Sequence, residues 1–116
     1  MSLTLQQFKA ELFKALSHPT RIRILELLRD GERTVTDLQS TLQVESSTMS
    51  QQLAILRNRN IVDARKEGTS VFYQVRDRAV YDLLDQARFM FQNHLVNLQS
   101  IVMEESAPAR RGDTAG

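Results

Sequence analysis

The stretch VESSTMSQQLAIL, residues 44–56, threads hydroxyl and amide side chains between regularly spaced large apolar residues. Such groups donate and accept hydrogen bonds at short reach, which is the chemistry that distinguishes base edges in the major groove of DNA. Gln51, for example, could form two hydrogen bonds with one adenine. On an isolated helix such a face would simply be solvated. In a helix that enters the major groove, we expect base edges or phosphates to be contacted by Ser46, Ser47, Thr48, Ser50, Gln51 and Gln52.

Basic residues gather in the same third of the chain. Between Ser46 and Arg78, six basic residues outnumber three acidic ones, a local charge of +3, whereas the whole chain carries only +1. A solvated surface of mixed charge would have a similar composition, but cationic side chains also bind DNA phosphates. We expect backbone contacts from Arg57, Arg59, Arg65, Lys66 and Thr69.

The stretch 46–58 is predicted to be a helix. At 100° per residue, Met49, Leu53 and Leu56 fall in one narrow sector, and Ser47 and Gln51 project from the opposite side. Ser46 is a favourable N-cap residue. The helix is therefore expected to bury its apolar sector and to expose an uncharged polar face.

Three helices are predicted before this one. Pro19 suits a first helical position, which makes His18 the expected cap, and Gly31 is a typical helix end. Thr34 with Asp37 three residues later resembles a capping box. Apolar residues at steps of three and four place these helices at about residues 4–16, 19–30 and 35–42.

Residues 61–76 change from a helical to an alternating apolar pattern, which predicts a β-hairpin. A two-residue turn at Glu67-Gly68 would pair Ala64 with Val71 and Val62 with Tyr73. The resulting apolar face consists of Val62, Ala64, Val71, Tyr73 and Val75.

A long helix is predicted from about Asp77 to about Val102. Its heptad seam comprises Val80, Leu84, Ala87, Phe91, His94, Leu98 and Ile101. A helix of ~25 residues is ~37 Å long, more than the core of so small a domain requires. The seam therefore predicts a partner surface, most economically a second copy of the chain.

The order of these elements predicts the fold class: mostly α with a small β-hairpin. Two short helices joined by a short turn, then a hairpin, is the order of a winged helix-turn-helix domain, whose second helix enters the major groove. We expect one such domain over residues 1–105, with about five helices and a two-stranded wing. The composition of residues 106–116 is typical of a disordered tail.

Three segments together resemble the ArsR/SmtB-type bacterial transcriptional repressors: LSHPTRIRILELL, TVTDLQSTLQVESSTMSQQLAILRNRNIV and ARKEGTSVFYQV. The resemblance covers roughly residues 5–100. It implies a homodimer that binds an inverted-repeat DNA operator and blocks transcription until a signal releases it. It also implies that the first and last helices join the two subunits. The implied interface residues are Leu5, Phe8, Leu12, Leu84, Ala87, Phe91, His94, Leu98 and Ile101.

The sequence departs from this family where metals are sensed. Arsenite and cadmium sensors carry a cysteine box before the recognition helix, but this chain has no cysteine. Zinc and nickel sensors use paired histidines and carboxylates on the last helix, which here has only His94. We expect no metal and no cofactor, an interface role for His94, and an effector that the sequence does not name.

Other function classes find little support. No phosphate-binding glycine loop, nucleophile elbow or catalytic carboxylate pair is present, so we expect no enzyme. No membrane span or secretory signal is present, so we expect a cytoplasmic protein without a membrane partner. Two alternatives stay open: a winged-helix module for protein–protein interaction, and a metal-responsive repressor with a non-cysteine site.

Overall fold

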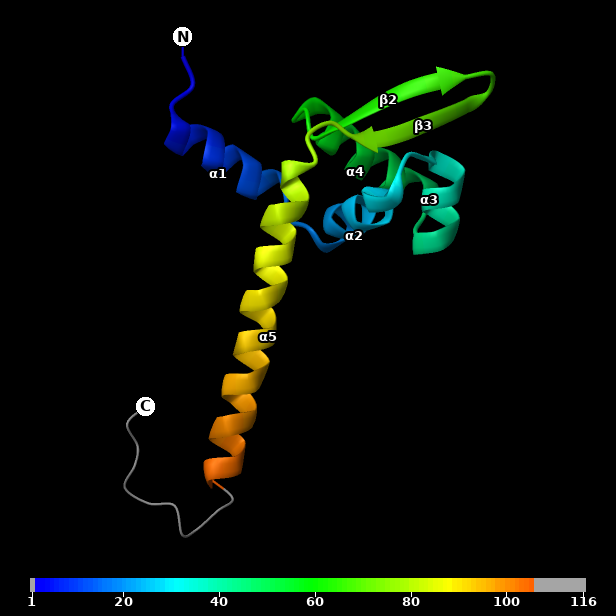
Figure 1. Cartoon of the computed structure of the whole chain (residues 1–116). Coiled ribbons are helices and arrows are strands. Elements are labelled where there is room, and N and C mark those ends of the chain that lie inside the picture. Colours follow the sequence, from blue (N-terminus) through cyan, green and yellow to red (C-terminus); the bar gives the residue numbers. More distant parts are fainter. Residues whose placement is uncertain (1, 106–116) are drawn as a thin grey trace. The chain divides into compact units, whose positions relative to one another are not determined.

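The computed structural model describes residues 2–105 (Figure 1). Side chains are described through residue 103. Two compact units follow each other along the chain, one ending at Arg78 and one beginning at Ala79. The tail predicted over residues 106–116 lies outside the described residues. The elements are α1 (Leu5–Ala15), α2 (Pro19–Leu27), the 3-10 turn η1 (Leu28–Asp30), β1 (Arg33–Thr34), α3 (Val35–Leu42), α4 (Ser46–Asn58), β2 (Val62–Glu67), β3 (Ser70–Val75) and α5 (Ala79–Glu105).

Side-chain caps begin the first three helices. The Nδ1 of His18 accepts a hydrogen bond from the backbone N–H of Thr20 at 3.1 Å. The hydroxyl of Thr34 likewise accepts from the backbone N–H of Asp37, and Thr4 caps α1 in the same way. The predicted caps at His18 and Thr34 are thus confirmed, because each signal lies within three residues of the donor that it satisfies.

The predicted N-cap of α4 is wrong by one residue. Gln43 takes a left-handed conformation with φ of 55° and ends α3. Glu45 is then extended and occupies the N-cap position, so Ser46 is already helical. The Glu45 side chain makes no capping hydrogen bond. The first turn of α4 therefore has backbone N–H groups that no side-chain cap satisfies.

The core of the first unit forms around α4, which contacts α2, α3 and β2. The predicted apolar sector of Met49, Leu53 and Leu56 is completely or almost completely buried. Burying such side chains stabilises the fold by about 1.5–3 kcal/mol each. The largest fully buried side chains are Ile24, Leu25, Leu28, Leu38, Met49, Leu53, Leu56 and Val62.

The hairpin forms as predicted, but its register is shifted by two residues. Ala64 pairs with Tyr73 and Val62 pairs with Val75, so the turn residues are Gly68 and Thr69. Gly68 has a φ of +63°, a conformation that favours glycine, at the first central position, as in type II′ turns. A shift of two preserves the side-chain alternation, so the predicted apolar face is kept.

The predicted two-stranded wing is part of a sheet of three strands, in the order β1-β3-β2. The extra strand is short: Arg33 pairs with Tyr73 and Thr34 pairs with Phe72. Two residues are too few to show an alternating pattern in the sequence. This strand joins the hairpin to the segment that begins α3.

Helix α5 has 27 residues, and from Gln86 to Met103 every side chain is exposed. The exposed apolar residues include members of the predicted seam and residues outside it: Phe89, Met90, Phe91, Leu95, Val96, Leu98, Ile101, Val102 and Met103. Leu5, Phe8 and Phe13 of α1 are exposed as well. In the described part of the chain, no helix combines the length and apolarity that crossing a bilayer requires.

Leu53→Ala tests the packing of α4. Leu53 is 2% exposed, so the substitution removes buried methyl groups and should lower the free energy of unfolding by about 2–5 kcal/mol. Urea denaturation at fixed protein concentration measures the loss. Gln51→Ala on the exposed face of the same helix is the control and should change stability by less than about 0.5 kcal/mol.

Candidate nucleic-acid interface

The polar residues predicted to contact DNA lie on the exposed side of α4, with one exception. Ser46, Ser47, Ser50 and Gln51 are exposed, and Thr48 is half-buried. No acidic side chain lies in the first turn of α4. This face presents only uncharged hydrogen-bonding groups, which suits the reading of base edges.

Gln52 is the exception and must be removed from the predicted contact set. Its side chain is 9% exposed, and its Oε1 has no hydrogen-bond partner within the described residues. The cause is helical geometry, because Gln52 follows Met49 by three positions and precedes Leu56 by four. It therefore shares the buried sector of α4 with those two residues.

The N-terminus of α4 is a second polar feature of this surface. Backbone bonding into the helix begins with the N–H of Met49, which donates to the carbonyl of Glu45. The preceding N–H groups have no side-chain cap, and the hydroxyl groups of Ser46 and Ser47 lie beside them. Free N–H groups and the helix dipole make such an end favourable for a phosphate.

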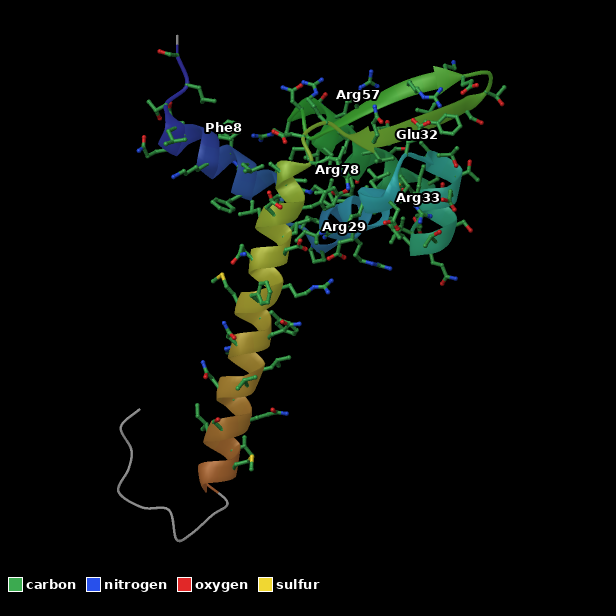
Figure 2. The ribbon with its side chains drawn as sticks, in the orientation of Figure 1. Phe8, Arg29, Glu32, Arg33, Arg57 and Arg78 are labelled. Carbon is green, nitrogen blue, oxygen red and sulfur yellow. The ribbon has the colours of Figure 1, made fainter. Side chains whose placement is uncertain are left out.

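A groove lies between α4 and the sheet. Ser50, Ala54 and Arg57 line one side at steps of four and three along α4, and Tyr73 of β3 lines another. The groove has a volume of about 440 Å³. Arg57, labelled in Figure 2, thus places a cation at the edge of the polar face.

Arg65 of β2 is held by two carboxylates. Its Nε and Nη2 donate to the carboxylate of Glu32 at 3.1 and 2.6 Å, and its Nη1 donates to Glu67 at 2.7 Å. Its guanidinium also lies over the ring of Phe72, 4.5 Å from the centroid. Figure 2 labels Glu32, which precedes β1 in the chain.

This arrangement gives Arg65 partners that the sequence did not predict. The hydrogen bonds to Glu32 and Glu67 raise the pKa of Arg65, and the Arg65 guanidinium lowers the pKa of Glu32. A guanidinium paired with two carboxylates is a poor phosphate ligand, because DNA would have to displace both. Arg65 instead ties the hairpin to the segment before β1 and so positions the wing.

Other arginines near the interface are also paired. Arg59, at the end of α4, forms an ion pair with Glu11 of α1, and Arg76 pairs with Asp63 across the hairpin at 2.6 Å. The Arg76 hydrogen bond, with a smaller contribution from the charge of Arg57, lowers the pKa of Asp63. Arg59, predicted as a backbone contact, is therefore already engaged.

Two predicted backbone cations have no such partner. Across the described residues, neither Arg57 nor Lys66 forms an ion pair, and both are exposed. Lys66 lies near the hairpin turn, next to the exposed Thr69 and Ser70. Among the predicted backbone contacts, Arg57 and Lys66 are thus the cations that have no carboxylate partner in the described residues.

Sequence reasoning missed the residues that position the wing. Glu32 and Arg65 are 33 positions apart, and no periodic pattern connects two residues at such a separation. The sequence feature that could have indicated the position of Arg65 is Phe72, which pairs with Arg65 in the hairpin register. Since the predicted register was shifted by two, it did not place these side chains opposite each other.

No group of three or more His, Cys, Asp or Glu residues that could hold a metal is found in the described part of the chain. His94, for which an interface role is predicted, is exposed on α5. Within the described residues, the structure therefore reveals no candidate metal site beyond those considered from the sequence.

Comparison with known proteins settles the family. The family model described as "Bacterial regulatory protein, arsR family" matches residues 18–64, from the cap of α2 into β2. The HTH-type transcriptional regulator Rv0081 of Mycobacterium tuberculosis is 46% identical over 85 residues, which cover 72% of this chain and 75% of that protein. The chain belongs to the ArsR family. It is a winged helix-turn-helix transcriptional regulator, as the sequence predicted.

Other ArsR-family comparisons agree. The crystal structure of Rv0081 superposes with a TM-score of 0.72 at 42% identity, covering 83% of this chain and 97% of that one. The solution structure of the homodimeric winged helix-turn-helix domain Mb0332 of Mycobacterium bovis gives 0.69 at 32% identity, with 78% and 84% covered. A transcriptional repressor SmtB homolog of Synechocystis is 40% identical over 72% of this chain and 63% of that one.

Glu32→Gln tests the positioning of the wing. Loss of the charge should weaken the hold on Arg65, so backbone amides of β2 and β3 should exchange about 2- to 5-fold faster at neutral pH. Hydrogen exchange followed by NMR measures this, and Asp30→Asn, an exposed residue two positions earlier, is the control. Equal exchange in both variants would contradict the assigned role.

The same contact depends on pH. Because the folded-state pKa of Glu32 is lowered from 4.5, its stabilising effect is complete above that pH and is lost as the pH falls through the lowered value. Wing amides should therefore lose protection only below about pH 4.5. In Glu32→Gln this part of the pH dependence should be absent.

Proposed function

We propose that two copies of this chain form a symmetric dimer that binds an inverted-repeat DNA operator and represses transcription in the cytoplasm. The observation that carries the proposal is the exposed, uncharged polar face of α4, together with the exposed Lys66 on the wing. A helix with such a face fits the major groove, while a wing reaches the backbone. Repression is supported by relatives named as repressors, among them the SmtB homolog. No catalytic role forms part of the proposal.

In this arrangement, base reading and phosphate binding fall to different residues. Gln51 reads a base, since its amide can form two hydrogen bonds with adenine. Ser47 and Ser50 reach neighbouring base edges. Arg57, Lys66 and the N-terminus of α4 hold phosphates and set the register of α4 in the groove.

Dimer formation is supported by the exposed apolar surface of α1 and α5. Phe8 is 53% exposed and Phe91 is 60% exposed, values that are unfavourable for large apolar side chains in water. Mb0332, at 32% identity, is described as homodimeric. A two-fold dimer places two α4 helices in successive major grooves, about 34 Å apart, which requires a palindromic operator.

Gln51→Ala and Lys66→Ala separate the two roles on an operator selected from genomic fragments. Gln51→Ala should cost about 1–3 kcal/mol of affinity for the operator and almost nothing on random duplex. Lys66→Ala should weaken both duplexes equally and lower the salt slope by about 1 per contact. Fluorescence anisotropy across a salt series measures both quantities.

Thr41→Ala, outside the proposed surface, serves as the control for these titrations and should leave affinity and salt slope unchanged. If wild-type binding to any duplex stays weak and independent of salt, the proposal fails, and the module for protein–protein interaction becomes the better account. Indistinguishable effects of the two substitutions on operator and random DNA would overturn the division of roles.

Phe91→Glu tests the dimer. Burying a carboxylate in an apolar interface is strongly unfavourable, so the variant should sediment as a monomer. Gln92→Glu adds the same charge at the neighbouring position, outside the predicted seam, and should remain dimeric. Sedimentation velocity compares the two. A dimeric Phe91→Glu would place the interface elsewhere.

A further inference from the structure

A second cavity lies at the opposite end of α4 from its N-terminal polar turn. It has a volume of about 350 Å³, within the range of ligand pockets, and it opens between the end of α1, the first turn of α2 and the last turn of α4. Its lining includes Lys14, Ser17, Arg21, Ile55, Asn58 and Arg59. Three of these residues are cations, and none is acidic.

The charge of this cavity is only partly compensated. Glu11 pairs with Arg59 at the α1 side, and one carboxylate against three cations leaves a charge of +2. Lys14 forms no ion pair in the described part of the chain and is exposed to solvent. The local field therefore favours an anion.

Arg21 adds a fixed hydrogen-bond donor to the wall. Its Nη1 donates to the carbonyl of Ala15 at 3.0 Å, which holds the side chain against the end of α1. Its Nε is buried and has no acceptor among the described residues. Because this nitrogen is buried, a ligand in the cavity would meet the outer nitrogens of the guanidinium and not Nε.

We propose that this cavity binds a small molecule carrying an oxyanion group, either a phosphate or a carboxylate, and that this molecule is an effector of the regulator. Guanidinium and ammonium groups converging on one cavity match oxyanions through charge-assisted hydrogen bonds. The hydroxyl of Ser17 already donates to the carbonyl of Lys14 at 2.7 Å, so it is available to the remainder of the ligand as an acceptor. The amide of Asn58 is a second neutral polar group of the lining.

The position of the cavity allows a bound ligand to affect the helix that we propose binds DNA. Arg59 is the C-cap of α4 and its guanidinium bonds to Glu11 of α1. An anion bound beside Arg59 competes with Glu11 and changes the link between α1 and α4. By linkage, anion and operator then alter each other's affinity by the same factor. Only this coupling rests on the proposed DNA function.

Isothermal titration of the full-length protein with inorganic phosphate, and separately with succinate, tests the site at constant ionic strength and without DNA. Saturable binding of one anion per protomer is expected. Lys14→Gln should weaken it about tenfold, as expected for one charge-assisted contact. Lys9→Gln, an exposed lysine of α1 outside the cavity, should change it less than twofold. A preference for phosphate or for succinate assigns the oxyanion.

Arg21→Gln should abolish anion binding, provided that circular dichroism shows the variant to be folded. If this variant does not fold, the titration of Lys14→Gln is the test of the site. Loss of binding in Lys66→Ala but not in Lys14→Gln would place the anion on the DNA surface and overturn the proposal. Weaker operator binding by Lys14→Gln in the absence of added anion would overturn it too, since the cavity would then be a DNA contact. Because the titration contains no DNA, failure of the operator proposal leaves its result interpretable.

Discussion

The burial of one side of α4 is the constraint on which the remaining arrangement depends. Met49, Leu53 and Leu56 fill the centre of the core, and this fixes the rotation of the helix about its axis. Once that rotation is fixed, Ser47 and Gln51 face solvent, whereas Gln52 turns inward with an unpaired oxygen. Packing, and not polarity alone, therefore determines which polar residues of this helix are available to DNA.

The arginines show why a local charge excess overstates the phosphate-binding capacity of a surface. Arg59, Arg65 and Arg76 each pair with a carboxylate that lies elsewhere in the sequence or across the hairpin. Exposed pairs contribute little to the stability of the fold, but they occupy donors that phosphates would need. What remains is a small number of cations around a neutral polar helix. In the proposed complex with DNA, such a surface would derive less of its affinity from salt-dependent contacts and more from groove contacts.

The features that the sequence predicted correctly have local causes. His18 and Thr34 cap helices through donors two or three residues away, and the apolar sector of α4 follows from period alone. The missed features need distant partners. The register of the hairpin is one example, because alternation fixes only which face is apolar and allows shifts by two. The bond between Glu32 and Arg65 is another, since it exists only once β1 has joined the sheet.

The contact between Arg59 and Glu11 is the one ion pair that links α1 to the end of α4 in the described residues. One exposed ion pair is too weak to hold two helices rigidly, and α1 exposes Leu5, Phe8 and Phe13 instead of burying them against its own unit. A partner that covers these side chains therefore adds contacts to α1 that its own unit does not supply. If that partner is a second copy, the distance between the two α4 helices depends on a joint that small changes in charge can shift. In the proposed complex, operator spacing is fixed by DNA geometry, so such a shift would weaken binding without unfolding any element.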